Sequence, residues 1–422
     1  MRLILKKLLA ILAKRVIARY HPIVIGITGS VGKSTAKEAI FCILNEKYWV
    51  WKNGENFNNE FGTPNAVLGI KSVGNDSKQG GKLTILAGVV KGFWLAYGLR
   101  QKYPKFLVLE LAADRPGDIK YLADIVKPSV GVVTAIGAVP VHVEFYASPQ
   151  EVADEKSGLI SALAPTGLAV LNYDDQTVLD MAVKTRAKII TFGFSDEAGV
   201  WVSDVSYFAS DSGQTIGGLS FTIHSGNSLI QTRIANIIGL HQIYGILAGA
   251  AIGLRFGMNL AEISGALDNF KPPRSRMTLL KGIKNSVVID DSYNASPSSV
   301  HAALDSLSGF AKSLTAIRGE KVRKIAVLGD MKELGKYEIE AHQAIGNLAG
   351  ERTDILITVG GAAKFIADSA ASHMPKENIL SFSTSQEAAK KTKEIVKEGD
   401  IILVKGSHSM KMELVVGEIA VN

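Results

Sequence analysis

The segment 26–35, which reads Gly-Ile-Thr-Gly-Ser-Val-Gly-Lys-Ser-Thr, carries the residues with the clearest chemistry. Its inner glycines let backbone N–H groups turn toward a single point, and a helix that starts directly after them favours a bound anion. Lys33 can reach the β- and γ-phosphates of a nucleotide, and the hydroxyl of Ser34 or Thr35 can bind Mg²⁺. The segment therefore predicts a phosphate-binding loop.

The loop departs from the strict spacing of nucleotide-binding loops, which places glycine where this chain has Ile27. Thr28 and Gly29 lie inside the loop instead. An ordinary glycine-rich turn is the alternative interpretation. We favour the phosphate loop because an apolar, strand-like run precedes it at 23–27 and a helical pattern follows from Ala36.

Polar side chains that could assist the loop lie near predicted strand ends. Glu110 ends an apolar run, and a carboxylate beside a phosphate loop is a natural Mg²⁺ ligand. His142 follows a second strand end, although a lone histidine is more often structural, and Lys156 on its own would be a solvated helix lysine. Asn58 and Asn59 lie in a polar loop that could be only a turn.

Alternating strand-like and helix-like segments surround these residues from position 22 to about 193. Short apolar runs predict strands over residues 23–27, 106–110, 130–134, 168–171 and 188–192. The helical patterns between them imply a parallel sheet with helices on both faces. Residues 199–238 change to strands separated by Ser and Gly turns, which predicts a small antiparallel appendage, and residues 239–257 predict a helix.

The segment 270–273, Phe-Lys-Pro-Pro, is the strongest linker signal, and a second α/β unit is expected after it. The strands predicted for this unit are 286–290, 324–328, 355–359 and 401–404. Active sites in such sheets lie at the carboxyl ends of the strands. Polar residues follow these strands, among them Asp290, Asp291, Tyr293, Asn294, Asp330, Lys405 and Ser407. The predicted divisions are 1–21 for an N-terminal basic helix, 22–272 for a central nucleotide-binding domain and 273–422 for a C-terminal domain.

The bulk composition fits a globular protein of two or three domains, with 422 residues, 47% hydrophobic and 21% charged. The single cysteine excludes a disulfide framework and fits a reducing compartment, so we expect a cytoplasmic protein. The net charge of +7 suits a phosphate-bearing substrate, and we expect no nucleic-acid partner. We expect a monomer.

Residues 1–21 are basic and apolar and predict an amphipathic helix. Five Lys and Arg residues between positions 6 and 19 interrupt it too often for a membrane-spanning helix, and we do not expect a signal peptide. We favour packing of this helix on the nucleotide domain, and contact with an anionic membrane surface is the alternative. Residues 84–99 are a second apolar stretch, for which we predict a buried helix because it is short and carries Lys91.

Five motifs resemble those of the Mur ligases, in the same order. They are the phosphate loop, Asn-Phe-Asn-Asn-Glu-Phe-Gly-Thr-Pro (56–64), Asp-Asp-Ser-Tyr-Asn-Ala-Ser-Pro (290–297), Gly-Asp-Met-Lys-Glu-Leu-Gly (329–335) and Val-Lys-Gly-Ser-His-Ser-Met (404–410). The resemblance is greatest to the branch that adds D-alanyl-D-alanine to UDP-N-acetylmuramoyl-tripeptide. It implies an α/β fold in which a P-loop central domain, with a mostly parallel sheet and an antiparallel appendage, precedes a Rossmann-like α/β C-terminal domain.

The resemblance also implies a reaction in peptidoglycan precursor synthesis. ATP phosphorylates the terminal carboxylate of a UDP-linked muramoyl peptide, and the amine of D-alanyl-D-alanine attacks the acyl phosphate. A carboxylate is a poor acylating agent, and phosphoryl transfer gives it a good leaving group. Mg²⁺, Lys33 and the loop amides would neutralise the charge on the transferring phosphoryl group.

Site residues follow from matching the family's motifs to this chain. The residues expected to bind ATP are Thr28, Gly29, Ser30, Gly32, Lys33, Ser34, Thr35, Gln242, Arg276 and Asp291. The expected catalytic residues are Lys33, Glu110, His142 and Lys156, and the expected Mg²⁺ ligands are Ser34, Glu110, His142 and Lys156. The residues expected near the substrates are Asn58, Asn59, Asn294, Asp330, Lys405 and Ser407. Lys156 resembles a family lysine that is carbamylated, which would turn a cation into an anionic oxygen ligand.

Two departures from the family pattern bear on the substrate. Mur ligases normally carry an N-terminal domain that holds UDP, whereas only the basic helix precedes the phosphate loop here. Either the UDP-sugar is held differently or the acceptor is not a UDP-linked peptide. The adenine-contacting motif Gly-x-His-Asn reads Gly239-Leu-His-Gln242, and the Asn expected three residues later is Gly245.

Alternative functions remain open at this point. A ligase of the same fold could act on another carboxylate, such as a folate-type or poly-amino-acid acceptor. A nucleotide-binding protein without catalysis, docked to a membrane by residues 1–20, is a second alternative, and a P-loop motor is a weaker third. Because the predicted ATP-binding residues fall in both units, catalysis would require the linker near residues 271–274 to act as a hinge.

Overall fold

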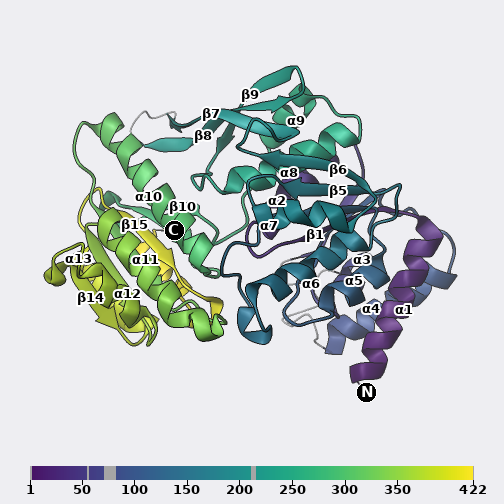
Figure 1. Cartoon of the computed structure of the whole chain (residues 1–422), viewed down its shortest axis with the longest axis horizontal. Coiled ribbons are helices and arrows are strands. Elements are labelled where there is room, and N and C mark those ends of the chain that lie inside the picture. The colour runs from purple at the N-terminus through teal and green to yellow at the C-terminus, as the bar shows by residue number, and fades with distance from the viewer. Residues whose placement is uncertain (1, 55–56, 71–81, 211–214, 422) are drawn as a thin grey trace.

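Two β-sheets form the framework of the protein in a computed structural model that describes residues 2–54, 57–70, 82–210 and 215–421. Asn56, which opens the second of the five motifs, lies outside the described residues. The first sheet belongs to the central unit and the second to the unit that follows the linker, and the two units lie side by side (Figure 1).

The first sheet has nine strands in the order β2-β3-β1-β4-β5-β6-β7-β8-β9. Its strands are β1 (Ile23–Thr28), β2 (Val50–Lys52), β3 (Phe106–Glu110), β4 (Val130–Val133), β5 (Leu168–Asn172), β6 (Lys188–Gly193), β7 (Val200–Ala209), β8 (Ile216–Ser225) and β9 (Ser228–Ala235). Strands β1 to β6 pair in parallel, as continuous apolar runs buried on both faces predict. The predicted antiparallel appendage is confirmed as β7–β9, and it continues the same sheet through the pairing of β6 with β7.

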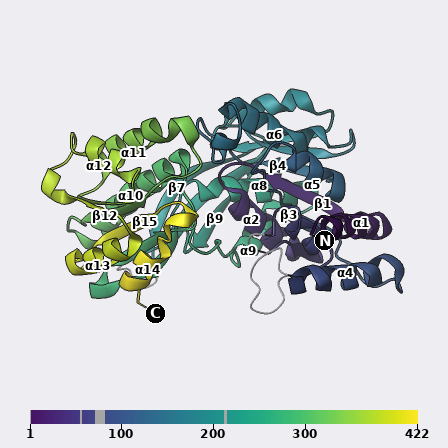
Figure 2. The same cartoon turned by 90° about the horizontal axis from the view of Figure 1, so that it is seen from below.

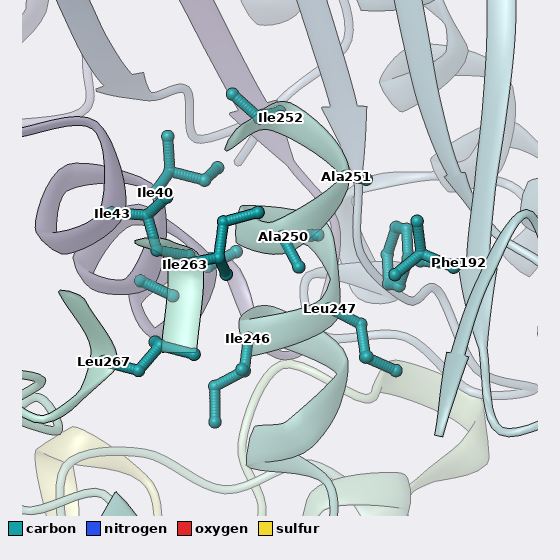
Figure 3. Close-up of a cluster of buried hydrophobic side chains, with 14 of the residues drawn as sticks. Ile40, Ile43, Phe192, Ile246, Leu247, Ala250, Ala251, Ile252, Ile263 and Leu267 are labelled. Atoms are coloured by element: carbon teal, nitrogen blue, oxygen red, sulfur yellow. The ribbon is translucent and has the colours of Figure 1, made fainter. Parts of the chain in front are cut away.

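Helices cover both faces of this sheet. The central unit contains α1 (Arg2–Tyr20), α2 (Lys33–Asn45), α3 (Gly62–Val67), α4 (Lys82–Tyr97), α5 (Asp118–Val126), α6 (Pro149–Ser161), α7 (Gln176–Leu179), α8 (Gln242–Arg255) and α9 (Leu260–Leu267). On one face, α8 packs against α2 and α9 on one side and against the strands on the other, and their apolar side chains form a common core (Figure 3). On the other face, α1, α3, α4 and α5 share a second core with β1 and β3.

The second sheet has six strands in the order β10-β11-β15-β12-β13-β14. Its strands are β10 (Thr278–Lys281), β11 (Val287–Asp291), β12 (Lys324–Gly329), β13 (Ile355–Val359), β14 (Ile379–Phe382) and β15 (Ile401–Lys405). All pairs are parallel except β10 with β11. Helices α10 (Pro297–Arg318), α11 (Glu338–Arg352) and α12 (Ala363–Ala370) cover one face, and α13 (Ser385–Ile395) and α14 (Glu413–Ile419) cover the other.

The N-terminal helix is confirmed, and it packs on the central unit as we favoured. Leu9, Leu12, Ala13 and Val16 of α1 are fully or almost fully buried against α3, α4 and α5. None of the described helices is long and apolar enough to cross a membrane.

The prediction of a buried helix over residues 84–99 is wrong in one respect. The helix forms as α4, but only one side of it is buried, through Ile85, Leu95 and Ala96. The other side carries large apolar side chains that face solvent, including Val90 and Trp94, because α4 lies at the outside of the molecule beyond α1. We expected burial because the apolar stretch is short and carries Lys91.

Candidate functional site

The phosphate loop folds tightly against the neighbouring strand β4. Gly29 adopts φ 142°, and an added Cβ there would lie 2.1 Å from Thr134 Oγ1, so only glycine fits. Gly32 adopts the left-handed conformation with φ 88° directly before α2. The two glycines therefore turn the chain from the end of β1 into the first turn of the helix.

The N–H groups of the loop and those of the helix after it have different roles. Ser30 N and Val31 N both donate to Ala135 O, at 2.6 and 3.3 Å, which anchors the loop to the segment after β4. The N–H groups of the first turn of α2 have no partner within the helix, as at every helix start. These groups and the positive end of the helix dipole form the anion-binding position of the loop.

The side chain of Lys33 folds back over the phosphate loop. Its Nζ donates to Gly29 O at 2.8 Å and to Ser30 O at 3.3 Å. Burial lowers the pKa of Lys33, and the charge of Glu110 opposes this shift. The ammonium group is thus held at the mouth of the loop by carbonyl groups that a nucleotide phosphate could replace as partners.

Glu110 is the acidic centre of the site. Strand β3 pairs with β1 so that Glu110 lies opposite Ile27, two residues before Gly29. Its Oε2 accepts a hydrogen bond from Ser34 Oγ at 3.0 Å and lies 3.8 Å from Lys37 Nζ, and its Oε1 accepts from Asn58 Nδ2 at 3.3 Å.

The charge state of Glu110 follows from these neighbours. Burial by itself would raise the pKa of Glu110, but the charges of Lys37, Lys33 and Arg276 lower it overall. The hydrogen bond from Ser34 adds to that effect. Glu110 is therefore an anion at neutral pH, as a metal ligand must be.

Asn53 is a positioning residue that the sequence did not indicate. Its Nδ2 donates to Glu110 O at 3.0 Å, and its Oδ1 accepts from Glu110 N at 3.0 Å. The same Nδ2 donates to Phe57 O at 2.8 Å. This bond connects the polar loop that carries Asn58 and Asn59 to the end of β3. Only the folded arrangement reveals this role, because Asn53 is far from Glu110 in sequence.

His142 lies where the two units meet. It adopts φ 66°, with its Nδ1 2.5 Å from Glu333 Oε2 of the second unit and its Nε2 3.5 Å from Asp114 Oδ1. Glu144 N also donates to Glu333 O, at 3.3 Å. His142 therefore faces two carboxylates, one from each unit.

Lys156 is almost completely buried in α6, with 1% exposure. Desolvation lowers the pKa of its amine to about 7, and the charge of Lys33 contributes to this shift. The charges of Asp114 and Glu110 act in the opposite direction, which places the amine within electrostatic range of both carboxylates. Unlike the solvated helix lysine that the sequence alone suggested, it is a partly neutral amine near the acidic centre.

Polar groups of the second unit face the loop from the opposite side. Lys405 Nζ donates to Asp291 Oδ2 at 2.6 Å and to Asn294 O at 2.9 Å, and both charged side chains are buried. Burial lowers the pKa of Lys405, and Asp291 opposes this shift. The guanidinium of Arg276 lies 4.3 Å from the ring centre of Tyr293.

A cavity of about 370 Å³ lies between the two units and brings most of the predicted residues together. The predicted residues that line it are Ser30, Gly32, Lys33, Ser34, Thr35, Asn58, Asn59, Glu110, His142, Gln242, Arg276, Asp291, Asn294 and Lys405. Tyr293, which we expected at a strand end, also lines it. Four residues that we did not predict as site residues line it as well, namely Asp114, His241, Ser299 and His408. Their types were visible in the sequence, but their convergence depends on the packing of the two units.

Five predicted residues lie outside the lining of this cavity. Thr28 is buried and donates to Leu111 O at 3.1 Å, Gly29 packs against Thr134 within the loop, and Lys156 is buried in α6. Asp330 and Ser407 form a separate polar cluster in the second unit. Asp330 Oδ1 accepts from Ala363 N at 2.7 Å, and Ser407 Oγ accepts from Lys332 N at 2.9 Å.

The side-chain amide of Gln242, the predicted adenine contact, is held in place by hydrogen bonds to the backbone. Its Nε2 donates to Arg276 O at 3.1 Å, and its Oε1 accepts from Gly239 N at 3.2 Å. His241 beside it is half-buried, and its pKa is lowered to about 4 by desolvation, so the ring is neutral. Its Nδ1 has no hydrogen-bond partner among the described residues and borders the cavity.

The side chains around Glu110 supply part of a cation's coordination shell rather than a complete set of protein ligands. No group of three or more His, Cys, Asp or Glu side chains arranged to hold a metal occurs in the described part of the chain. Ser34 Oγ and Glu110 Oε2 are oxygen donors already 3.0 Å apart at the start of α2. Mg²⁺ is commonly bound by one or two protein oxygens together with substrate phosphates and water, and this donor pair suits that mode.

Models of two protein domains match this chain. The Mur ligase middle domain matches residues 95–253, and the Mur ligase glutamate ligase domain matches residues 275–408.

Individual proteins match over almost the whole chain. UDP-N-acetylmuramoyl-tripeptide–D-alanyl-D-alanine ligase from Bacillus subtilis is 30% identical over 412 residues, which cover 97% of this chain and 78% of that enzyme. The ligase of the same name from Mycobacterium leprae is 31% identical, with 94% and 74% of the two chains covered. The crystal structure of MurF ligase from Thermotoga maritima in complex with ADP superposes with a TM-score of 0.78 and 25% identity, and the match covers 98% of this chain and 83% of that one.

Proposed function

Because this chain belongs to the Mur ligase family, we propose that it is an ATP-dependent ligase that joins D-alanyl-D-alanine to UDP-N-acetylmuramoyl-tripeptide. The observation that carries the proposal is the cavity between the units. There the phosphate loop and Glu110 face Arg276, Asp291 and Lys405, in a chain similar over nearly its full length to enzymes with that activity. The reaction belongs to peptidoglycan precursor synthesis.

The chain's own groups account for the binding of ATP. The first turn of α2 and Lys33 hold the β- and γ-phosphates, since both present cationic or N–H groups to the cavity. Arg276 adds a positive charge from the second unit. We propose that Gln242 and the neutral His241 contact the base of the nucleotide, because both line the cavity.

Ser34 and Glu110 would hold Mg²⁺ beside the phosphates, with His142 as a ligand of a second ion. Bound Mg²⁺ would neutralise charge on the transferring phosphoryl group and orient it. Glu110 remains an anion for this task because the surrounding cations lower its pKa.

We further propose that Lys156 is carbamylated. Its amine, with a pKa of about 7, is partly unprotonated at neutral pH and can attack CO₂. The product is an N-carboxylate with the proton released to solvent. A buried anion at this position would face Lys33 and lie near the proposed metal site.

The bond changes balance without a further reactant. An oxygen of the tripeptide's terminal carboxylate attacks the γ-phosphorus, and the bond to the β–γ bridging oxygen breaks to release ADP. The amine of D-alanyl-D-alanine then attacks the acyl carbon and releases a proton to solvent, the amide forms, and phosphate leaves with the oxygen that came from the carboxylate. Lys405, Asp291 and Asn294 border the side of the cavity from which we propose that the amine approaches.

The test is an acceptor screen with the whole protein. Purified enzyme with ATP and Mg²⁺ is given UDP-N-acetylmuramoyl-tripeptide and D-alanyl-D-alanine, and the products are identified by mass spectrometry. The proposal predicts the pentapeptide product together with ADP and phosphate in equal amounts. Turnover with a folate or poly-amino-acid acceptor and none with the muramoyl peptide would show a different ligase. Nucleotide binding without turnover on any acceptor would show a non-catalytic protein.

A further inference from the structure

Helix α4 exposes a continuous apolar face. Its solvent-facing residues recur at helical spacing, and each is 48–64% exposed: Leu83, Leu86, Val90, Phe93, Trp94 and Tyr97. Leu99, just after the helix, is 81% exposed. Monomeric proteins seldom expose so many large apolar side chains together, and a patch of this kind marks an interaction site.

Helix α1 runs parallel to α4 and extends this face. Because Gly88 and Gly92 of α4 have no side chain, α4 packs closely against Leu9 and Leu12 of α1. Arg15 lies over the ring of Tyr97, with its guanidinium 5.2 Å from the ring centre, which joins the exposed sides of the two helices.

Exposed side chains on α1 complete the surface. Leu3, Ile4 and Ile11 are 57–70% exposed. Arg19 donates to Leu95 O and Gly98 O, at 3.2 and 2.7 Å, so α1 is fixed to the end of α4. The two helices therefore form one rigid surface.

This surface is also the most cationic part of the chain. Six Lys and Arg residues lie in α1, two in α4 and three in residues 98–105, and these segments contain no Asp or Glu. The rest of the chain carries 36 Lys and Arg and 40 Asp and Glu, so the basic excess of the whole protein comes from this region. Asp124 of α5 pairs with Lys14, so these segments keep a large but not complete excess of cations. Apolar side chains flanked mainly by cations match an anionic lipid surface.

We propose that α1, α4 and residues 98–105 form a docking surface for an anionic lipid bilayer. Trp94, Tyr97 and Phe93 would enter the headgroup region, where aromatic side chains are favoured, and the Lys and Arg residues would contact lipid phosphates. The contact is peripheral, since no described helix can cross a membrane. A second copy of the chain fits this surface poorly, because a two-fold interface would bring two predominantly cationic patches together.

The location of the surface is compatible with catalysis. Both views show α1 and α4 at the end of the molecule opposite to the second unit, with α13 far from them (Figures 1 and 2). Docking there would leave the cavity between the units and the movement of the second unit unobstructed.

Vesicle binding tests the proposal with the full chain. Co-sedimentation is measured with vesicles of phosphatidylglycerol and phosphatidylcholine, and with vesicles of phosphatidylcholine alone. We expect binding to the anionic vesicles that weakens as salt is added, with at least about tenfold weaker binding to the neutral ones. Brominated lipid should quench the fluorescence of Trp94, and W94F should lose that quenching.

Matched variants distinguish lipid binding through this surface from non-specific hydrophobic or electrostatic binding. V90E/F93E should weaken binding to anionic vesicles at least about tenfold, because it places two anions on the docking face. V183E/L229E adds the same charges at apolar side chains exposed elsewhere and should bind like the unaltered protein. K7E/K102E should weaken binding more than K364E/K390E, which alters exposed lysines of the second unit.

The variants should keep the thermal stability and solution ligase activity of the unaltered protein, since none alters a residue of the cavity. Equal binding to anionic and neutral vesicles, absence of binding, or equal binding by V90E/F93E and V183E/L229E would overturn the proposal. A dimer that V90E/F93E dissociates, without vesicle binding, would instead assign the face to a second copy.

Discussion

Glu110 is the residue on which the site is centred. It is buried, yet three cations and the hydroxyl of Ser34 keep it ionised, and Asn53 fixes its backbone on both sides. A buried carboxylate with this many positive neighbours is suited to bind a cation that arrives with the phosphates of ATP.

Replacing Glu110 tests this role. E110Q keeps the shape of the side chain but removes its charge, and we expect turnover to fall by about 100-fold or more, with a raised Mg²⁺ requirement. Mg²⁺ titrations of phosphate release measure both effects. E38Q is the control, because Glu38 also lies near Lys37 but does not line the main cavity. Equal activity of E110Q and the unaltered enzyme would remove Glu110 from the metal site.

Lys156 gives a prediction with a defined pH dependence. Because burial lowers its pKa from 10.5 to about 7, the reactive neutral amine gains population as pH rises through about 7 and is lost below it. Enzyme freed of CO₂ should regain activity on addition of bicarbonate, to a greater extent at pH 8 than at pH 6. A ¹³C signal of a carbamate from labelled CO₂ should follow the same profile.

Two substitutions control for the position of this lysine. K156A should lose both the carbamate signal and turnover, whereas K184A, which removes a lysine paired with Asp154 of the same helix, should keep both. Full activity of K156A would exclude carbamylation at Lys156 as a requirement of the reaction.

The elements that carry the site depend on the close packing of α2 and α8. A Cβ added at Gly245 would lie 2.7 Å from Ala36 N, and one added at Gly249 would lie 2.9 Å from Ile43 Cδ1 and 3.2 Å from Ala39 C. The departure from the family pattern at Gly245 therefore has a structural reason, because any side chain there would push α8 away from the helix that begins the phosphate site.

Glycine substitutions on these helices should differ by position. G249A should destabilise the protein by about 1–3 kcal/mol through overpacking, and G245A should also weaken ATP binding by displacing the start of α2. G265A is the control, because a Cβ on α9 at that position meets nothing within 4 Å and alanine favours a helix by about 0.5–1 kcal/mol. Denaturant unfolding measures the free energy of unfolding of each variant. If G265A lost as much stability as G249A, the packing argument would be refuted.

The elements also show what the sequence could and could not predict. Long apolar runs such as β1 and β3 and the phosphate loop were predictable because their patterns are local. Strands β2, β10 and β14 were not predicted, since three or four residues give too little periodicity, and they form mainly through pairing with longer neighbours. The exposed face of α4 and the contact of His142 with Glu333 depend on tertiary packing, which no local pattern encodes.

At the scale of the whole molecule, the site is assembled by two units. The cavity takes its phosphate-binding groups from one sheet and Asp291 and Lys405 from the other. Ser275 and Met277, just after the predicted linker, both adopt φ 53°, and His142 of the first unit contacts Glu333 of the second. A hinge at residues 271–274 would open and close this arrangement.

Small-angle X-ray scattering should detect that movement. We expect a smaller radius of gyration when a non-hydrolysable ATP analogue and the acceptor peptide are both bound than in the free protein. K33A, which should bind the ATP phosphates more weakly, should show a smaller change in the radius of gyration at the same ligand concentrations. Superimposable curves for free and liganded protein would contradict closure.

The most direct test of the central claim follows an oxygen atom. The terminal carboxylate of UDP-N-acetylmuramoyl-tripeptide is labelled with ¹⁸O, and the phosphate released during ligation with D-alanyl-D-alanine is analysed by mass spectrometry. If the chain activates the carboxylate by phosphorylation, each phosphate released will carry one ¹⁸O from the peptide. Amide product accompanied by unlabelled phosphate, or phosphate release without product, would contradict the account.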